Sequence, residues 1–83
     1  MAPTAEEWIA RFAEALGRPA PSEEDVQAVL ELASVAAHSS ERRAAPVACW
    51  LAALAGTPPR EAREIAQRLS EGAPPPAPEP PDR

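Results

Sequence analysis

The sequence lacks lysine and tyrosine, contains one cysteine and three glycines, and has no long apolar run. A single cysteine excludes an internal disulfide, and one histidine with one cysteine is too few for a zinc site within one chain. Three glycines leave no glycine-rich phosphate loop. No stretch approaches the roughly 18 apolar residues of a membrane span. These absences argue against disulfide-stapled, metal-dependent, nucleotide-binding and membrane-spanning proteins.

The charge balance is acidic, with 13 acidic against 8 basic residues and a net charge of −5. Nucleic acids and anionic membrane surfaces both favour a basic face. The first residues, MAPTAEEWIARF, carry acids where a signal peptide needs positive charge. The lone cysteine fits a reducing compartment. We therefore expect a cytoplasmic protein that binds neither nucleic acid nor a membrane.

The residues that are abundant favour helix. Alanine is frequent and β-branched residues are few. Four amphipathic segments carry recognisable start residues, namely Thr4, Ser22, Pro46 and Thr57. Gly17, Gly56 and Gly72 are the stop residues. The sequence predicts an all-α fold, a small four-helix domain over residues 1–72, followed by a disordered proline-rich tail over residues 73–83.

The second segment is apolar on more than one side. Its main stripe consists of Val26, Val29, Leu30, Ala33 and Ala37. Leu32 and Val35 fall off this stripe, which predicts either a central helix or a helix with a second contact surface. These two residues are therefore a candidate interface. Trp8 and Trp50 are expected to anchor the core, with an interface role as the alternative.

The stretch AAHSSERRAAP, residues 36–46, holds the only histidine and two adjacent arginines. His38 either stabilises the end of a helix or contacts a ligand. Arg42 and Arg43 precede a helix start, where they form either an anion or partner contact or a solvated turn tied to Glu41. Cys49 is expected to be a small buried hydrophobe. No catalytic grouping stands out, which favours a non-enzymatic protein without a cofactor.

Several motifs, taken together, resemble a known family. They are Ala37-His38, Arg42 and Ala45-Pro46; Trp8-Ile9, Phe12 and Leu16-Gly17; Leu30-Glu31-Leu32-Ala33; and the run from Trp50 to Gly56. The combination resembles a small helical domain family of unknown function from high-GC Gram-positive bacteria. Its members occur alone or appended to proteins similar to molybdenum cofactor guanylyltransferases. Ser39 and Arg43 depart from the glycine and proline that this family often carries there.

The resemblance implies a pathway context and no catalytic residues. On that basis we expect an accessory or adaptor domain linked to molybdenum cofactor or molybdoenzyme maturation. Its partner would be a molybdoenzyme or a cofactor-maturation protein, with His38 and Arg42 as a polar contact. The alternative is a structural protein–protein interaction domain, a homodimer without a ligand site. In that case the 36–46 stretch only connects two helices.

Overall fold

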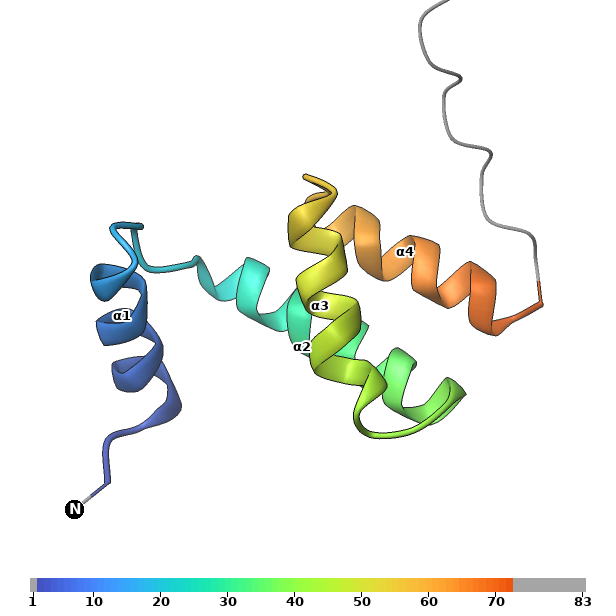
Figure 1. Ribbon diagram of the computed structural model, residues 1–83, viewed down its shortest axis with the longest axis horizontal. Coiled ribbons are helices and arrows are strands. Elements are labelled where there is room, and N and C mark those ends of the chain that lie inside the picture. The colour runs from blue at the N-terminus through green and yellow to red at the C-terminus, as the bar shows by residue number, and fades with distance from the viewer. Residues whose placement is uncertain (1, 73–83) are drawn as a thin grey trace, which may run out of the picture.

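The computed structural model describes residues 2–72, which form four helices and no strand. The helices are α1 (Ala5–Ala15), α2 (Glu23–Ser39), α3 (Ala44–Leu54) and α4 (Pro59–Ser70) (Figure 1). The predicted all-α fold of four helices is confirmed. The predicted tail, residues 73–83, lies outside the described residues.

Side-chain caps fix the starts of the first two helices, as the sequence predicts. The Glu7 N–H donates to Thr4 Oγ1 at 3.1 Å, and the Thr4 N–H donates to Glu7 Oε1 at 2.9 Å. This reciprocal pair is a capping box. The Asp25 N–H donates to Ser22 Oγ at 3.1 Å. Gly17 then ends the first helical segment with a φ of 75°, which costs glycine little.

The starts of α3 and α4 differ from the prediction. α3 begins at Ala44, before Pro46, because the first N–H groups of a helix have no intrahelical acceptor. A proline at the third position therefore removes no helical hydrogen bond. α4 begins at Pro59 with Pro58 as its N-cap, so Thr57 lies one residue too early to cap it. Neither helix has a side-chain cap. At α4, the fixed φ of Pro59 suits the first helical position.

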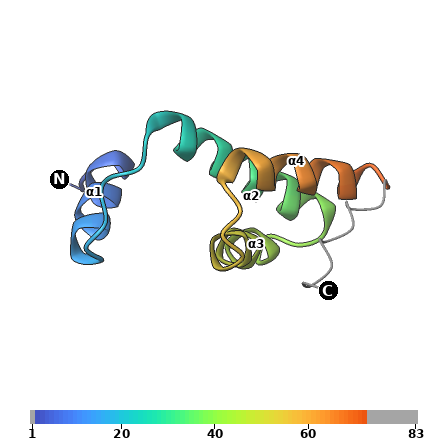
Figure 2. The same cartoon turned by 90° about the horizontal axis from the view of Figure 1, so that it is seen from above.

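Three helices form a small bundle around α2. α2 packs against both α3 and α4, whereas α3 and α4 meet only slightly. Figure 2 shows α2 and α4 side by side with α3 lying across them. The buried residues of this bundle are Ala28, Leu32 and Ala62. A hydrogen bond of 2.9 Å from Ser39 Oγ to Ser70 Oγ joins the ends of α2 and α4.

The first helix stands apart from this bundle. No Cα of α1 lies within 8 Å of a Cα in another helix, and Figure 1 shows α1 beyond the start of α2. A shallow hollow at the junction is lined by Ile9 and Ala10 of α1, with Pro21 and Val26 among the residues opposite. Residues 16–22 are therefore the segment that connects α1 to the bundle of α2, α3 and α4.

The most buried face of α2 is not the predicted main stripe, of which Val26, Val29, Ala33 and Ala37 are half-buried. Leu32, predicted to lie off the main stripe, is 5% exposed and belongs to the core. Leu30, a member of that stripe, is 58% exposed. The reason is that α3 and α4 flank α2 on either side of the Leu32 face, so this face is the one that they cover. α2 is therefore the central helix of the bundle, and Leu30 is the exposed member of its main stripe.

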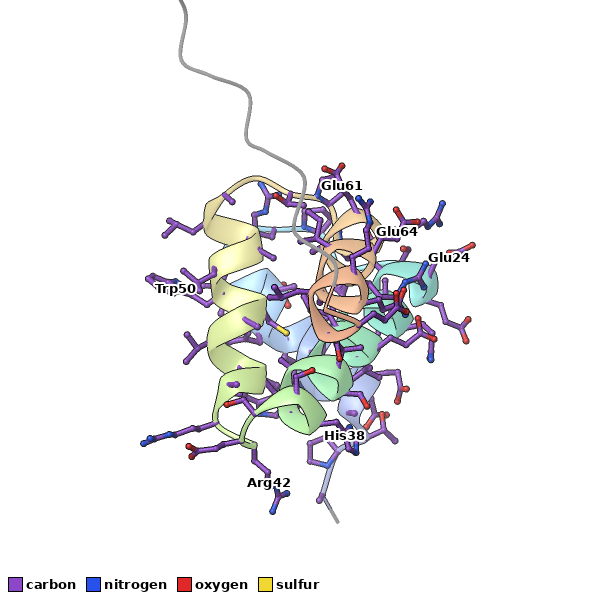
Figure 3. The ribbon with its side chains drawn as sticks, turned by 90° about the vertical axis from the view of Figure 1, so that its right-hand side faces the viewer. Glu24, His38, Arg42, Trp50, Glu61 and Glu64 are labelled. Atoms are coloured by element: carbon purple, nitrogen blue, oxygen red, sulfur yellow. The ribbon has the colours of Figure 1, made fainter. Side chains whose placement is uncertain are left out.

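The expectation that the two tryptophans anchor the core is wrong. Trp8 is 55% exposed and Trp50 is 61% exposed. α1 has no neighbouring helix to cover Trp8, and Trp50 points away from α2 and α4 (Figure 3). Their apolar surface is therefore open to a partner.

Leu32→Ala and Leu30→Ala form a matched pair on one helix. We expect Leu32→Ala to lower the free energy of unfolding by about 2–5 kcal/mol, because it leaves a cavity between three helices. Leu30→Ala should change it by no more than about 0.5 kcal/mol, since the side chain is largely exposed. Urea unfolding followed by circular dichroism measures both. Equal losses would contradict the assignment of the Leu32 face as the core.

Capping variants test whether α1 is coupled to the bundle. Thr4→Ala should destabilise α1 alone, by about 0.5–2 kcal/mol, because no Cα of α1 lies within 8 Å of a Cα in another helix. Amide hydrogen exchange in α1 should then accelerate while the melting temperature of the bundle stays constant. Ser22→Ala should instead lower that temperature, by about 4–8 °C for each kcal/mol lost. A fall in both variants would show that α1 is coupled to the bundle.

Candidate functional site

His38 lies in the last turn of α2 and is committed to its own helix. Its Nδ1 is 2.8 Å from the Ser34 carbonyl oxygen and 3.3 Å from Ser34 Oγ. When Nδ1 carries the ring proton, it donates to that carbonyl, which lies before the last four carbonyls of α2 that a helix leaves without intrahelical donors. The structure thus gives His38 a contact within its own helix, and both predicted roles, stabilising the helix end or contacting a ligand, stay predictions.

The two arginines lie in the turn before α3 and are exposed. Arg43 Nε is 3.2 Å from Glu41 Oε1, in a pair that solvent surrounds. Such a pair contributes little stability, and the carboxylate offsets the positive charge that an anion would need. No hydrogen bond or ion pair within residues 2–72 joins His38 to Arg42. Both lie at the same end of the bundle (Figure 3).

A hollow beside His38 combines a polar end with an apolar floor. Its polar lining includes His38, Ser39 and Ser70, and its apolar lining includes Leu32 and Val35. Ser70 comes from α4 and has no counterpart in the sequence reasoning, because only the packing of α4 on α2 brings it to Ser39. Leu32 is buried and Val35 is half-buried. In this conformation Leu32 is therefore not open to a partner, while Val35 is accessible from the hollow.

Polar side chains on one edge of α2, Gln27 and Glu31, make their hydrogen bonds within the bundle. Arg63 Nη1 on α4 donates to Glu31 Oε1 at 2.6 Å, and Gln27 Nε2 donates to Glu31 Oε2 at 3.4 Å. The hydrogen bond from Arg63, followed by that from Gln27, lowers the pKa of Glu31 below its usual 4.5. This ion pair links α2 to α4.

Cys49 faces the bundle from α3. Its Sγ lies 3.9 Å from the Val29 carbonyl oxygen, and the residue is half-buried. Burial raises the pKa of this thiol, which disfavours the reactive thiolate. The expected role as a small packed hydrophobe fits this position, although burial is only partial.

Within residues 2–72, no three side chains of His, Cys, Asp or Glu are grouped as a metal site requires. The same part of the chain holds no helix with the length and apolar character to cross a membrane.

Exposed apolar side chains form the most distinctive surface feature. Trp8 and Phe12 of α1 and its C-cap residue Leu16 follow at i, i+4 and i+8 and are each at least half exposed; this set is called the α1 stripe. The rings of Trp8 and Phe12 stack with centroids 5.1 Å apart. Such patches on a small protein mark contact surfaces. The α1 stripe is therefore a stronger candidate site than the 36–46 turn.

Glu31→Gln tests the ion pair through pH. Because the folded-state pKa of Glu31 is lowered, the pair contributes stability above pH 4.5, the usual value, and loses it as the pH falls through the lowered value. The wild type should be more stable than Glu31→Gln at neutral pH, and the difference should vanish in acid. Thermal melts across this range measure it, with Glu24→Gln as the control for an exposed carboxylate. A gap between wild type and Glu31→Gln that does not depend on pH would contradict the role of charge.

Comparison with known proteins assigns the chain to a family. A family model described as "Domain of unknown function (DUF6457)" matches residues 2–78. Neither a curated protein nor a solved structure matches the chain. The matched range covers all four helices and includes every candidate residue discussed above. The chain therefore belongs to the DUF6457 family of domains of unknown function.

Proposed function

We propose that this domain is a non-enzymatic adaptor that binds a protein partner through the α1 stripe. The observation that carries the proposal is the combination of isolation and exposure in α1. No Cα of the helix lies within 8 Å of a Cα in another helix, and Trp8, Phe12 and Leu16 are at least half exposed. An unpaired apolar stripe of this kind suits docking of a helix into a groove.

The composition of α1 supports that mode of binding. Glu6 and Glu7 lie in its first turn, where the helix dipole stabilises negative charge. The capping box satisfies backbone N–H groups at the start of the helix. Even so, an 11-residue helix is marginal on its own in water. A partner groove would both cover the stripe and hold the helix in shape. The stacked tryptophan is the kind of side chain that dominates such interfaces.

The identity of the partner is a finer proposal that rests on the sequence resemblance. It names a molybdoenzyme or a cofactor-maturation protein as the partner. Arg42 is exposed and its side chain makes no hydrogen bond or ion pair within residues 2–72, so it is the member of the 36–46 turn best placed for a polar contact. His38 would support the shape of that turn through its bond to Ser34.

Affinity capture from the source cells tests the proposal, with three tagged variants beside the wild type. Phe12→Ala removes the centre of the α1 stripe. Leu30→Ala is the control, since it removes an exposed apolar side chain from another helix. His38→Ala/Arg42→Ala removes the polar turn. We expect the wild type and the control to retrieve the same protein, and Phe12→Ala to bind it about 30-fold more weakly or worse, as hot-spot residues do.

Circular dichroism must first show that each bait is folded. Retrieval of a molybdoenzyme or maturation protein would support the finer proposal. Loss of the partner only in His38→Ala/Arg42→Ala would move the site to the 36–46 turn. Equal retrieval by wild type and Phe12→Ala would overturn binding through α1. Recovery of nothing except the chain itself would favour the alternative, a homodimerisation domain without a ligand site.

A further inference from the structure

The contact between α2 and α3 is covered by α4 on one side and open on the other. Cys49 of α3 marks this contact, because its Sγ lies 3.9 Å from the Val29 carbonyl oxygen of α2. Successive residues of a helix are about 100° apart, so Leu32 and Leu30 lie on opposite sides of Val29 around the axis of α2. Leu32 is buried and lines a hollow together with residues of α4. Leu30 therefore lies on the side of α2 that faces away from α4.

Trp50 lies on the same open side of α3. Ala48 and Ala52 line a hollow together with residues of α4, so they lie on the α4 side of Cys49. Trp50 is about 100° from Cys49 in the opposite direction, and Figure 3 shows it pointing away from α2 and α4. Leu30 and Trp50 are 58% and 61% exposed. These two residues mark the uncovered apolar surface that is called the α2–α3 face.

α1 already stands at one end of the α2–α3 face. Val26 precedes Leu30 by four residues and therefore lies on the same side of α2. Ile9 and Ala10 of α1 line a hollow together with Val26. Figure 2 shows α1 and α3 on the same side of α2, and Figure 1 shows α1 beyond the start of α2. A rotation of α1 about the 16–22 link would therefore carry it along α2 toward α3.

We propose that α1 closes onto the α2–α3 face, so that the α1 stripe packs against Leu30 and Trp50. The described arrangement is then the open form, in which the stripe is free for a partner. In the closed form, the chain's own helices cover Trp8 and Phe12. The inference rests on the proposed function in one respect. Closure competes with the partner for the α1 stripe and therefore acts as autoinhibition.

The covalent link selects α1 of the same chain as the occupant. Residues 16–22 span at most about 23–25 Å, and one end of this link is fixed at the start of α2. A segment held by so short a link has an effective concentration on the order of millimolar, far above that of a second copy in dilute solution. α3 contains no charged residue that would oppose the approach. Closure removes apolar surface of both α1 and the α2–α3 face from water.

Disulfide trapping in the full chain tests the closure. Cys49→Ala removes the native thiol. Ala15→Cys and Ala53→Cys then place one exposed thiol on α1 and one on α3. The control pair combines Ala15→Cys with Glu64→Cys, on α4 (Figure 3). With glutathione disulfide as the oxidant and a dilute chain, we expect the α1–α3 pair to form an intramolecular disulfide at least about tenfold faster than the control pair.

A further substitution in the α1–α3 pair shows whether the α1 stripe drives closure. Phe12→Ala should slow formation of the disulfide by about tenfold, because closure then buries less apolar surface. Glu14→Ala, at an exposed position on the same helix, should leave the rate unchanged. Circular dichroism first shows that each variant is folded.

An α1–α3 pair that reacts no faster than the control pair would overturn closure, and so would a rate that Phe12→Ala leaves unchanged. Covalent dimers in place of a linked monomer would also overturn it and would place α1 on a second copy. In the capture experiment, the oxidised α1–α3 pair should retrieve less partner than the same bait after reduction with dithiothreitol. Equal retrieval would overturn autoinhibition. If no bait retrieves a partner, the adaptor proposal fails while disulfide trapping still decides closure.

Discussion

The close approach of α2 to its two neighbours is the contact on which the bundle depends, and small side chains make it possible. Ala28 and Ala62 are buried beside Leu32, and alanine lets helix backbones come near one another. The same residues bury little apolar surface, at about 25 cal/mol for each Å² removed from water. A core of one leucine and two alanines therefore leaves most large apolar side chains of the chain on the outside.

Polar contacts add to the apolar core in holding α2 and α4 together. Arg63 and Glu31 join α4 to α2 along one edge, and Ser39 with Ser70 joins the ends of the same two helices. No comparable contact ties α3 to α4 among the described residues, and these helices meet only slightly. The bundle is thus held chiefly through α2. Its stability and its surface chemistry both follow from how little is buried.

Local features were predictable from the sequence, whereas the choice of buried face was not. Thr4 and Ser22 cap their helices as expected, because a cap needs only residues three positions apart. Leu32 and Leu30 are both apolar and on one helix, so periodicity alone cannot tell which of them faces a neighbour. Trp8 is exposed because α1 lacks a neighbouring helix, a fact of tertiary packing. The 36–46 turn attracted notice for rare residues, yet its histidine bonds to its own helix.

The link between α1 and α2 determines how far apart a bound partner and the bundle can be. Residues 16–22 lie between Ala15 and Glu23, and seven residues span at most about 23–25 Å when fully extended. Pro19 and Pro21 restrict the backbone of this link further. Any protein that binds α1 must therefore have the three-helix bundle close to its own surface. The bundle would then shield that neighbouring surface from competing molecules. The length of the link would limit how far the shielded surface extends from the site that binds α1.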